Sequence, residues 1–300
     1  MERKNLYFCV ILCLLVVTTL ATAQDIERQI TRTSEKEVKV KITASFGSVN
    51  ISKGNSDKIV QVYYRKKHRD EEPRLDLDYY IHNDVGDLRL EMNPKGVEVR
   101  SREHGDRHNI NINVNDFDFK SEEWYIKLVD DIPLSIKAEL GAGKNNFDFS
   151  GLNISDLSIS TGASSSTVEF DKKNENEIDE FKIETGVSKF VAENLNNANF
   201  RKLSFDGGVG SYYLDFGGEL THTVDVDVNV GLGAVKLTIP SNIGVRIKYQ
   251  DSWLSNLSVD DEFIRMKKGV YETDNYLKAE GRMNIYIASG LGSVKIRRSR

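Results

Sequence analysis

The residues of this chain that could support chemistry are carboxylates placed close together. Asp225 and Asp227 share one face of a strand-like segment, where each could perturb the pKa of the other or receive a cation. Asp130-Asp131 and Asp260-Asp261-Glu262 are further local groups. Glycosidic cleavage needs one protonated and one ionised carboxylate at a set separation across a groove. Alternating acidic residues are more typical of a solvated strand face, so we expect no catalytic residue here.

Metal and cofactor motifs are weak. His104 and His108 are four residues apart, but Gly105 and the charged neighbours favour a loop rather than a zinc-binding helix. Asp206–Ser211 has a serine where calcium-binding glycine repeats need an aspartate, which favours a corner turn. We therefore expect no metal ligands and no cofactor.

Nucleophile and phosphate-binding motifs are equally weak. Ser164-Ser165-Ser166 is not part of a Gly-x-Ser-x-Gly elbow. Gly141–Lys144 lacks the rest of a P-loop and precedes a strand. The sequence therefore predicts a protein that is not an enzyme.

Several exposed features could contact a partner. Only one of Tyr212 and Tyr213 can face inward on a strand, so the other should be exposed. Trp253, together with Tyr271 and Tyr276, could add to a sugar- or protein-binding surface. The basic segment Lys295–Arg300 is typical of a solvated tail and could also touch anionic lipid or cell-wall polymer.

Composition and the N-terminus predict an exported chain. The 300 residues carry 41 Lys and Arg against 46 Asp and Glu, a balance that argues against nucleic-acid binding. A basic start, an apolar run from Leu6 to Val17 and Ala21-Thr22-Ala23 predict a signal peptide over residues 1–23. An uncleaved anchor is the alternative. Both cysteines, Cys9 and Cys13, lie in this segment, and no later apolar run has the length of a membrane helix.

Apolar residues alternate with polar ones from Val38 onward. Val38–Ile42, Leu88–Met92, Ile110–Val114 and Val224–Val230 show this period of two, which indicates half-buried strands. Glu193–Asn199 and Lys172–Glu180 are the only weak helical candidates. The fold class is therefore all-β.

A glycine recurs at nearly constant intervals in the second half. Gly141, Gly162, Gly186, Gly208 and Gly231 are separated by 21, 24, 22 and 23 residues. Such a period predicts a single-stranded β-helix, or β-solenoid, with coils of about 21–24 residues. Each glycine would serve a corner with positive φ or the close packing of coils. An antiparallel sandwich is the alternative. The expected inward-facing residues are Leu134, Ile136, Leu157, Ile159, Phe181, Ile183, Leu203 and Phe205.

The expected organisation has four parts. After the signal peptide, residues 24–37 read as a polar tether and residues 38–130 as a less regular N-terminal β region. Residues 131–300 form the glycine-marked solenoid, with residues 259–284 as a long excursion before the sheet closes. We expect one continuous domain over residues 38–300.

Several motifs resemble a known family. Trp124–Leu128, Ile132-Pro133-Leu134 and Leu140–Gly143 look like the opening of the bacterial toast-rack N-terminal domain, and Asn194–Asn199, Gly207–Gly210 and Leu214–Gly218 resemble later repeats of such proteins. Gly231–Val235, Ile239-Pro240, Gly244-Val245 and Gly290–Val294 are similar to LiaF-like proteins, the cell-wall-active antibiotic response group. Before Asp116 the likeness rests on Phe46–Val49. The chain differs from the LiaF type because it has no multi-helix membrane portion.

The resemblance implies a β-helical, adhesin-like envelope protein without established catalytic residues. We therefore expect an exported, non-enzymatic interaction or scaffolding module of the bacterial cell envelope, periplasmic, outer-membrane-associated or extracellular. Its partner would be an envelope protein or a cell-surface polymer. The alternative is a polysaccharide-binding or polysaccharide-cleaving β-helix protein that uses Asp225 and Asp227.

Overall fold

The computed structural model describes residues 26–66, 74–93, 122–250 and 254–299. Strands make up almost all of the regular structure and join in one 16-stranded mixed sheet. They are β1 (Ile26–Thr31), β2 (Glu37–Lys53), β3 (Lys58–Lys66), β4 (Arg74–His82), β5 (Val85–Asn93), β6 (Glu122–Leu128), β7 (Leu134–Asp148), β8 (Ile154–Glu169), β9 (Ile178–Glu193), β10 (Phe200–Asp215), β11 (Thr223–Pro240), β12 (Gly244–Gln250), β13 (Ser255–Val259), β14 (Phe263–Lys267), β15 (Val270–Thr273) and β16 (Arg282–Ser299), with one 3-10 helix, η2 (Leu195–Ala198).

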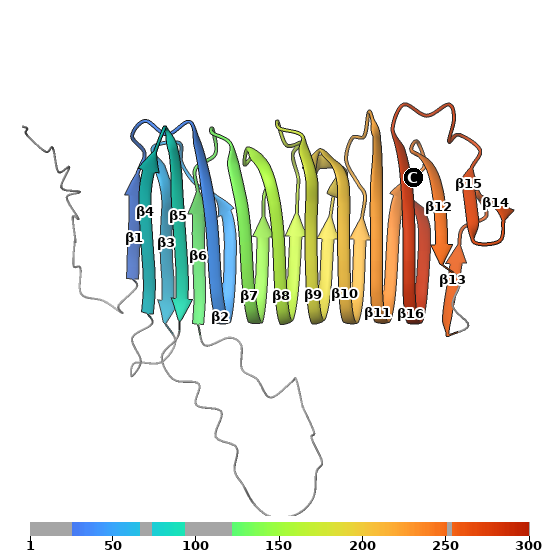
Figure 1. Cartoon of the computed structure of the whole chain (residues 1–300), viewed down its shortest axis with the longest axis horizontal. Helices are drawn as coiled ribbons and strands as arrows, with labels where there is room; N and C mark the ends of the chain where they lie inside the picture. The colour runs from blue at the N-terminus through green and yellow to red at the C-terminus, as the bar shows by residue number, and fades with distance from the viewer. Residues whose placement is uncertain (1–25, 67–73, 94–121, 251–253, 300) are drawn as a thin grey trace, which may run out of the picture.

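The centre of the molecule is a stack of long parallel strands. β2, β7, β8, β9, β10, β11 and β16 follow one another in space, each bent into a U and paired along its length with its neighbours (Figure 1). The register keeps equivalent positions of the repeat side by side, as in Phe181, Leu203 and Val226 of β9, β10 and β11. The all-β solenoid predicted from the glycine period is confirmed.

The core lies between the two halves of each bent strand. All of the residues expected to face inward, from Leu134 to Phe205, are fully buried. Aromatic rings from successive coils touch inside this core: between ring centroids, Phe149 lies 5.5 Å from Phe170, and Phe190 lies 5.6 Å from Phe205. Period-two patterning therefore identified the buried face correctly, because alternate side chains of a strand point to opposite sides.

Each long strand changes its inward face at the repeat glycine. In β9, alternation is interrupted at Gly186 and Val187, which are both exposed, and the buried set shifts by one residue beyond them. A Cβ added at Gly186 would lie 3.0 Å from the Gly162 carbonyl oxygen, and one at Gly208 would lie 2.7 Å from that of Gly186. Neither glycine has positive φ. Of the two roles expected for the repeat glycines, close packing of neighbouring coils is therefore the one that applies.

Asparagines organise the loops that join one coil to the next. The buried side chain of Asn174 accepts a hydrogen bond from the Ile154 N–H at 2.8 Å and donates to the Ile154 carbonyl at 2.7 Å. Asn194 and Asn199 flank η2 with left-handed backbone conformations. The turn expected within residues 193–199 is thus present. The helical alternative for residues 172–180 is wrong, because Asn174 ties this segment to β8 and β9 begins at Ile178.

The N-terminal end differs from the sequence expectation in two respects. Residues 26–31, expected to lie in a polar tether, form β1 and pair antiparallel with β3, with Ile30 packed partly against the core. The regular stack begins at β2, which pairs with β7 on one side and with β5 and β6 on the other. The antiparallel strands β4, β3 and β1 close this end.

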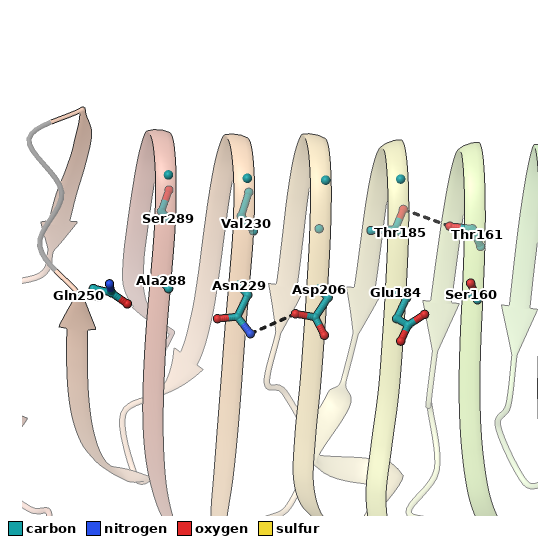
Figure 2. A pocket seen from close by; sticks show the side chains of 15 residues that line it. Ser160, Thr161, Glu184, Thr185, Asp206, Asn229, Val230, Gln250, Ala288 and Ser289 are labelled. Atoms are coloured by element: carbon teal, nitrogen blue, oxygen red, sulfur yellow. Dashed lines mark hydrogen bonds between the residues drawn. The ribbon is translucent and has the colours of Figure 1, made fainter.

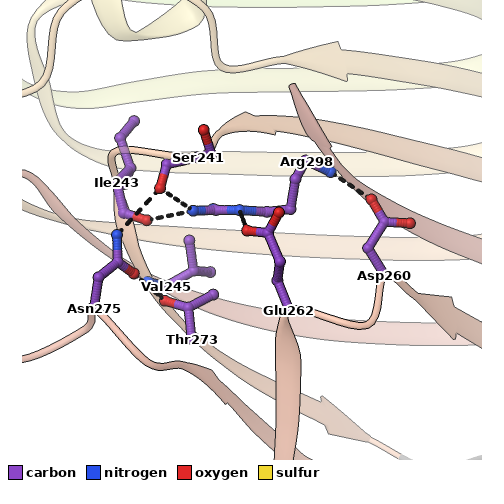
Figure 3. A network of polar contacts seen from close by, with 8 residues as sticks. All are labelled: Ser241, Ile243, Val245, Asp260, Glu262, Thr273, Asn275 and Arg298. Carbon is purple, nitrogen blue, oxygen red and sulfur yellow. Dashed lines mark hydrogen bonds and ion pairs between the residues drawn. The ribbon is translucent and has the colours of Figure 1, made fainter. Parts of the chain in front are cut away.

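The C-terminal end has an inserted coil. β16 lies between β11 and β12, although β12 precedes it by more than thirty residues in the chain. The expected excursion before β16 contains β14 and β15, which pair antiparallel beside β12. Figure 3 shows how Arg298 of β16 holds this region: its guanidinium donates to the carbonyls of Ser241 and Ile243 and to Glu262, while its backbone N–H donates to Asp260.

Some expected features lie outside the described residues. These are the signal peptide of residues 1–23 with Cys9 and Cys13, the His104 and His108 pair, the strand expected over Ile110–Val114, and Trp253. Within the described ranges, no helix has the length and apolar character needed to cross a membrane.

Candidate interaction surfaces

A trough follows the bends of the stack. Because the repeat glycines have no side chains, the floor of the trough consists of backbone at Gly186, Gly208, Gly231 and Gly290, and its volume is about 810 Å³. One wall is a row of polar side chains, seen in Figure 2 as Ser160, Glu184, Asp206 and Asn229 on successive strands.

The trough is rigid because its side chains bond to each other across the coils. Asn229 donates to Asp206 at 3.0 Å, and the buried hydroxyl of Thr161 donates to that of Thr185 at 3.0 Å (Figure 2). These bonds follow from the parallel register, which places equivalent positions of adjacent coils side by side. The surface is therefore suited to binding along its length rather than to closing around a small molecule.

A second surface surrounds Tyr213 on the outward face of the second half of the strands. Tyr212 is buried and Tyr213 is partly exposed, as expected from their adjacent positions. Tyr213, Lys236 and Lys295 stand in register on β10, β11 and β16, and the Lys236 ammonium lies 4.9 Å from the Tyr213 ring centroid. A shallow depression of about 390 Å³ adjoins them.

The two lysines of this second surface have no carboxylate partner in the part of the chain that the structure describes. Among the described residues, neither Lys236 nor Lys295 forms an ion pair. Other lysines of the stack differ from one another in this respect: Lys202 is paired with Glu180 at 3.2 Å and with Asp227 at 3.4 Å, whereas Lys189 has no ion pair within the described ranges. We name Tyr213, Lys236 and Lys295 the tyrosine–lysine patch.

The candidate catalytic carboxylates are engaged in structural contacts. Asp227 pairs with Lys202, and Asp225 accepts a hydrogen bond from Asn284 of β16 at 3.0 Å. Asp130 pairs with Lys53 at 2.7 Å and Asp131 with Arg32 at 2.6 Å. Asp225 and Asp227 are thus brought to one face, as expected, but each is tied to a different neighbouring coil.

The third acidic group and the other candidate residues also have structural roles. Asp260 and Glu262 bind Arg298. Ser164–Ser166 and Gly141–Lys144 lie within the continuous strands β8 and β7. Tyr276 is buried and Tyr271 is partly buried against the core. No three His, Cys, Asp or Glu side chains of the described ranges come together as a metal site.

Among the carboxylates with a shifted pKa, Glu35 and Glu169 are shifted in opposite directions. Burial acts to raise the pKa of Glu35, but hydrogen bonds from the Tyr79 hydroxyl at 2.5 Å and the Thr33 N–H at 2.7 Å outweigh it and hold the pKa below its usual value. Burial, and then the nearby negative charge of Asp171, raise the pKa of Glu169. The Glu35 bonds link the segment before β2 to β4, so this carboxylate stabilises the N-terminal end.

Sequence analysis missed two features of these surfaces. The tyrosine–lysine patch was missed because its members are 23 or more residues apart and only the register brings them together. The residue after each repeat glycine is aliphatic and exposed, from Ala163 in β8 to Leu291 in β16. The signal for this second feature is in the sequence, because each of these residues directly follows a repeat glycine.

Comparison with known proteins gives one family match. The family model described as the N-terminal domain of toast_rack matches residues 19–193. No curated protein matches.

Among solved structures, a "putative cell adhesion protein" from Clostridium sporogenes is similar at 19% identity, with a TM-score of 0.43, over 92% of this chain and 99% of that one. A "putative adhesin" from Bacteroides fragilis is similar at 12% identity, with a TM-score of 0.28, over 92% of this chain and 98% of that one.

Proposed function

Because the chain belongs to the toast-rack N-terminal domain family, we propose that it is an exported, non-enzymatic β-solenoid that acts as an adhesin-like interaction or scaffolding module of the bacterial cell envelope. The observation that carries this proposal is the tyrosine–lysine patch, in which an aromatic ring and two lysines without carboxylate partners stand in one row. A partner that supplies negative charge would complete this row.

The partner chemistry follows from the patch. Unpaired lysines on a flat sheet face favour an anionic partner, and a partly exposed tyrosine adds contact area with little loss of side-chain entropy. Because the lysines repeat with the spacing of neighbouring strands, about 4.8 Å, the patch fits an extended partner better than a compact ligand. We propose an acidic envelope protein or an anionic cell-surface polymer.

The proposal of a non-enzymatic role is supported by the contacts of the candidate carboxylates. A glycosidase would need Asp225 and Asp227 to differ in protonation and to face a substrate groove. The Lys202 and Asn284 contacts instead bind both side chains to the sheet surface. No observation favours the polysaccharide-cleaving alternative.

The proposal can be tested by site-specific photo-crosslinking in the native envelope. A photo-reactive residue replaces Lys236 in one variant and Lys182, an exposed lysine on the first half of β9, in the matched control. We expect the same species to be captured repeatedly from position 236, not from position 182, and to be lost when Tyr213→Ala and Lys295→Glu are added. Equal capture from both positions, or capture unaffected by those two changes, would overturn the proposal.

A further inference from the structure

An aliphatic ridge runs along the bends of the stack, beside the trough. Ala163, Val187, Val209, Leu232 and Leu291 are in register on β8, β9, β10, β11 and β16. The last four of these side chains are 58%, 44%, 45% and 44% exposed. Scattered exposed aliphatic residues are ordinary, but one at the same position of successive coils forms a continuous apolar strip.

The ridge and the trough form a self-complementary pair. The trough floor is the glycine that directly precedes each ridge residue, so a raised strip and a hollow strip run parallel along the same edge. A surface that pairs with its own copy about a two-fold axis must contain both complementary shapes. With the axis parallel to the stack, the ridge of each copy would enter the trough of the other.

Charges on either side of the edge fit the same arrangement. In β9, Glu184 stands two residues before Gly186 on the trough side, and Lys189 stands three residues after it on the ridge side. β7 repeats this spacing with Glu139 and Lys144 around Gly141. The two-fold rotation that places each ridge in the opposite trough also brings Glu184 of one copy opposite Lys189 of the other, on the same coil.

These two side chains are available for such a contact. Glu139 is already bound by Lys41 at 3.1 Å and Lys137 at 2.7 Å, but within the described ranges Glu184 and Lys189 have no ion pair. Both are exposed. The alternative axis, perpendicular to the stack, would place ridge against ridge and leave both troughs empty.

We propose that this edge is a self-association surface, on which a second copy of the chain packs its aliphatic ridge into the glycine trough, with Glu184 and Lys189 pairing across the two-fold axis. The ridge and the trough together span about 25 Å along the stack and about 15 Å across two packed sheets. The dimer contact therefore buries less accessible surface than the roughly 1,200 Å² typical of stable complexes. The dimer is therefore weak and forms at high local concentration, as on a crowded surface.

The inference does not depend on the proposed function, because the tyrosine–lysine patch lies on the outward face and not on the edge. Its test is sedimentation equilibrium of the full chain over a wide concentration range. We expect reversible dimers for the parent chain and a loss of association of at least about 10-fold for Leu232→Glu. Lys172→Glu, on the loop side of the stack, is the matched control. Far-UV circular dichroism and an unchanged unfolding midpoint verify that each variant is folded.

Exchanging the two charges distinguishes this dimer from other partners that could bind the same edge. Glu184→Lys and Lys189→Glu should each weaken self-association, whereas the double variant, or a mixture of the two single variants, should restore it. A parent chain that stays monomeric overturns the proposal, and so does a charge exchange that fails to restore association. Binding of the ridge to neutral lipid vesicles or to an extended peptide without dimerisation would likewise overturn it.

Discussion

Replacing Gly210 by alanine tests whether the stability of the stack depends on the close approach of neighbouring backbones. A Cβ at this position would lie 1.8 Å from the Ser188 carbonyl oxygen of β9, whereas ordinary contact begins near 3.4 Å. β10 would have to move away from β9 by roughly 1.5 Å in a ladder whose spacing is about 4.8 Å. The side chain cannot relieve this contact, because the clashing atom belongs to the neighbouring backbone.

The expected magnitude follows from what such a displacement breaks. Two ladder hydrogen bonds contribute about 1 kcal/mol each, and the shift of the packed rings of Phe205 and Tyr212 costs about 1–3 kcal/mol more. We therefore expect Gly210→Ala to lower the free energy of unfolding by about 3–5 kcal/mol. The readout is urea denaturation followed by far-UV circular dichroism.

Gly186→Ala provides the matched control. Its added Cβ would lie 3.0 Å from the Gly162 oxygen, so a displacement of a few tenths of an ångström relieves it. Alanine also reduces the entropy of the unfolded chain, which stabilises by about 0.4–1 kcal/mol. We expect a net change within about 1 kcal/mol of the parent. Equal effects at the two positions, or a Gly210→Ala protein as stable as the parent, would refute this reasoning.

Three further changes test the core, the loops and the N-terminal end. Phe205→Ala should destabilise by about 3–5 kcal/mol in calorimetry, because it leaves a cavity beside fully buried rings; an unchanged melting temperature would contradict it. Asn174→Leu leaves the Ile154 N–H and carbonyl without their partner and should cost about 2–4 kcal/mol, visible as faster hydrogen exchange at Ile154. Tyr79→Phe should raise the pKa of Glu35 towards its ordinary value of 4.5. Since that pKa is lowered in the folded state, its stabilising contribution is present above about pH 4.5 and is lost as the pH falls through the folded pKa. Acid denaturation of the variant should therefore begin at higher pH than that of the parent. An acid-denaturation curve identical to that of the parent would show that the lowered pKa of Glu35 does not stabilise the fold.

The buried face of the strands could be predicted from the sequence. Val, Ile, Leu and Phe alternate with polar residues, and in a strand this pattern alone decides which side chains meet in the core. The period between Gly141 and Gly231 gave the coil length, because each coil repeats the same bend. Residues such as Phe181 and Leu203 were identified correctly for this reason.

The ends of the stack could not be predicted in the same way. Glu27, Arg28 and Gln29 give residues 26–31 the polar composition of a tether, although Ile26 and Ile30 are four residues apart, a spacing that fits one face of a strand. The strand character of β1 depends on pairing with β3, a contact between residues about 30 positions apart. The hydrogen bonds of Asn174 likewise join two coils, so no local pattern marks them.

The candidate surfaces were only partly visible in the sequence. The opposite exposure of Tyr212 and Tyr213 follows from strand geometry and was predicted. Lys236 and Lys295 join Tyr213 only through the register of β10, β11 and β16, and β16 reaches that register by being inserted next to β11. A local reading cannot detect a surface whose members come from distant coils.

The insertion of β16 has a consequence for how the molecule assembles during synthesis. The order of the strands in space is not the order in which a ribosome makes them, because β12 to β15 emerge before the strand that must lie between β11 and β12. Until β16 arrives, the long edge of β11 has no permanent partner, and such an edge readily pairs with other chains. β12 carries the same alternation as the first half of β16, so we expect it to pair with that edge until β16 is made. On this expectation, β16 must displace β12 from β11 to complete the stack, and an internal coil forms last.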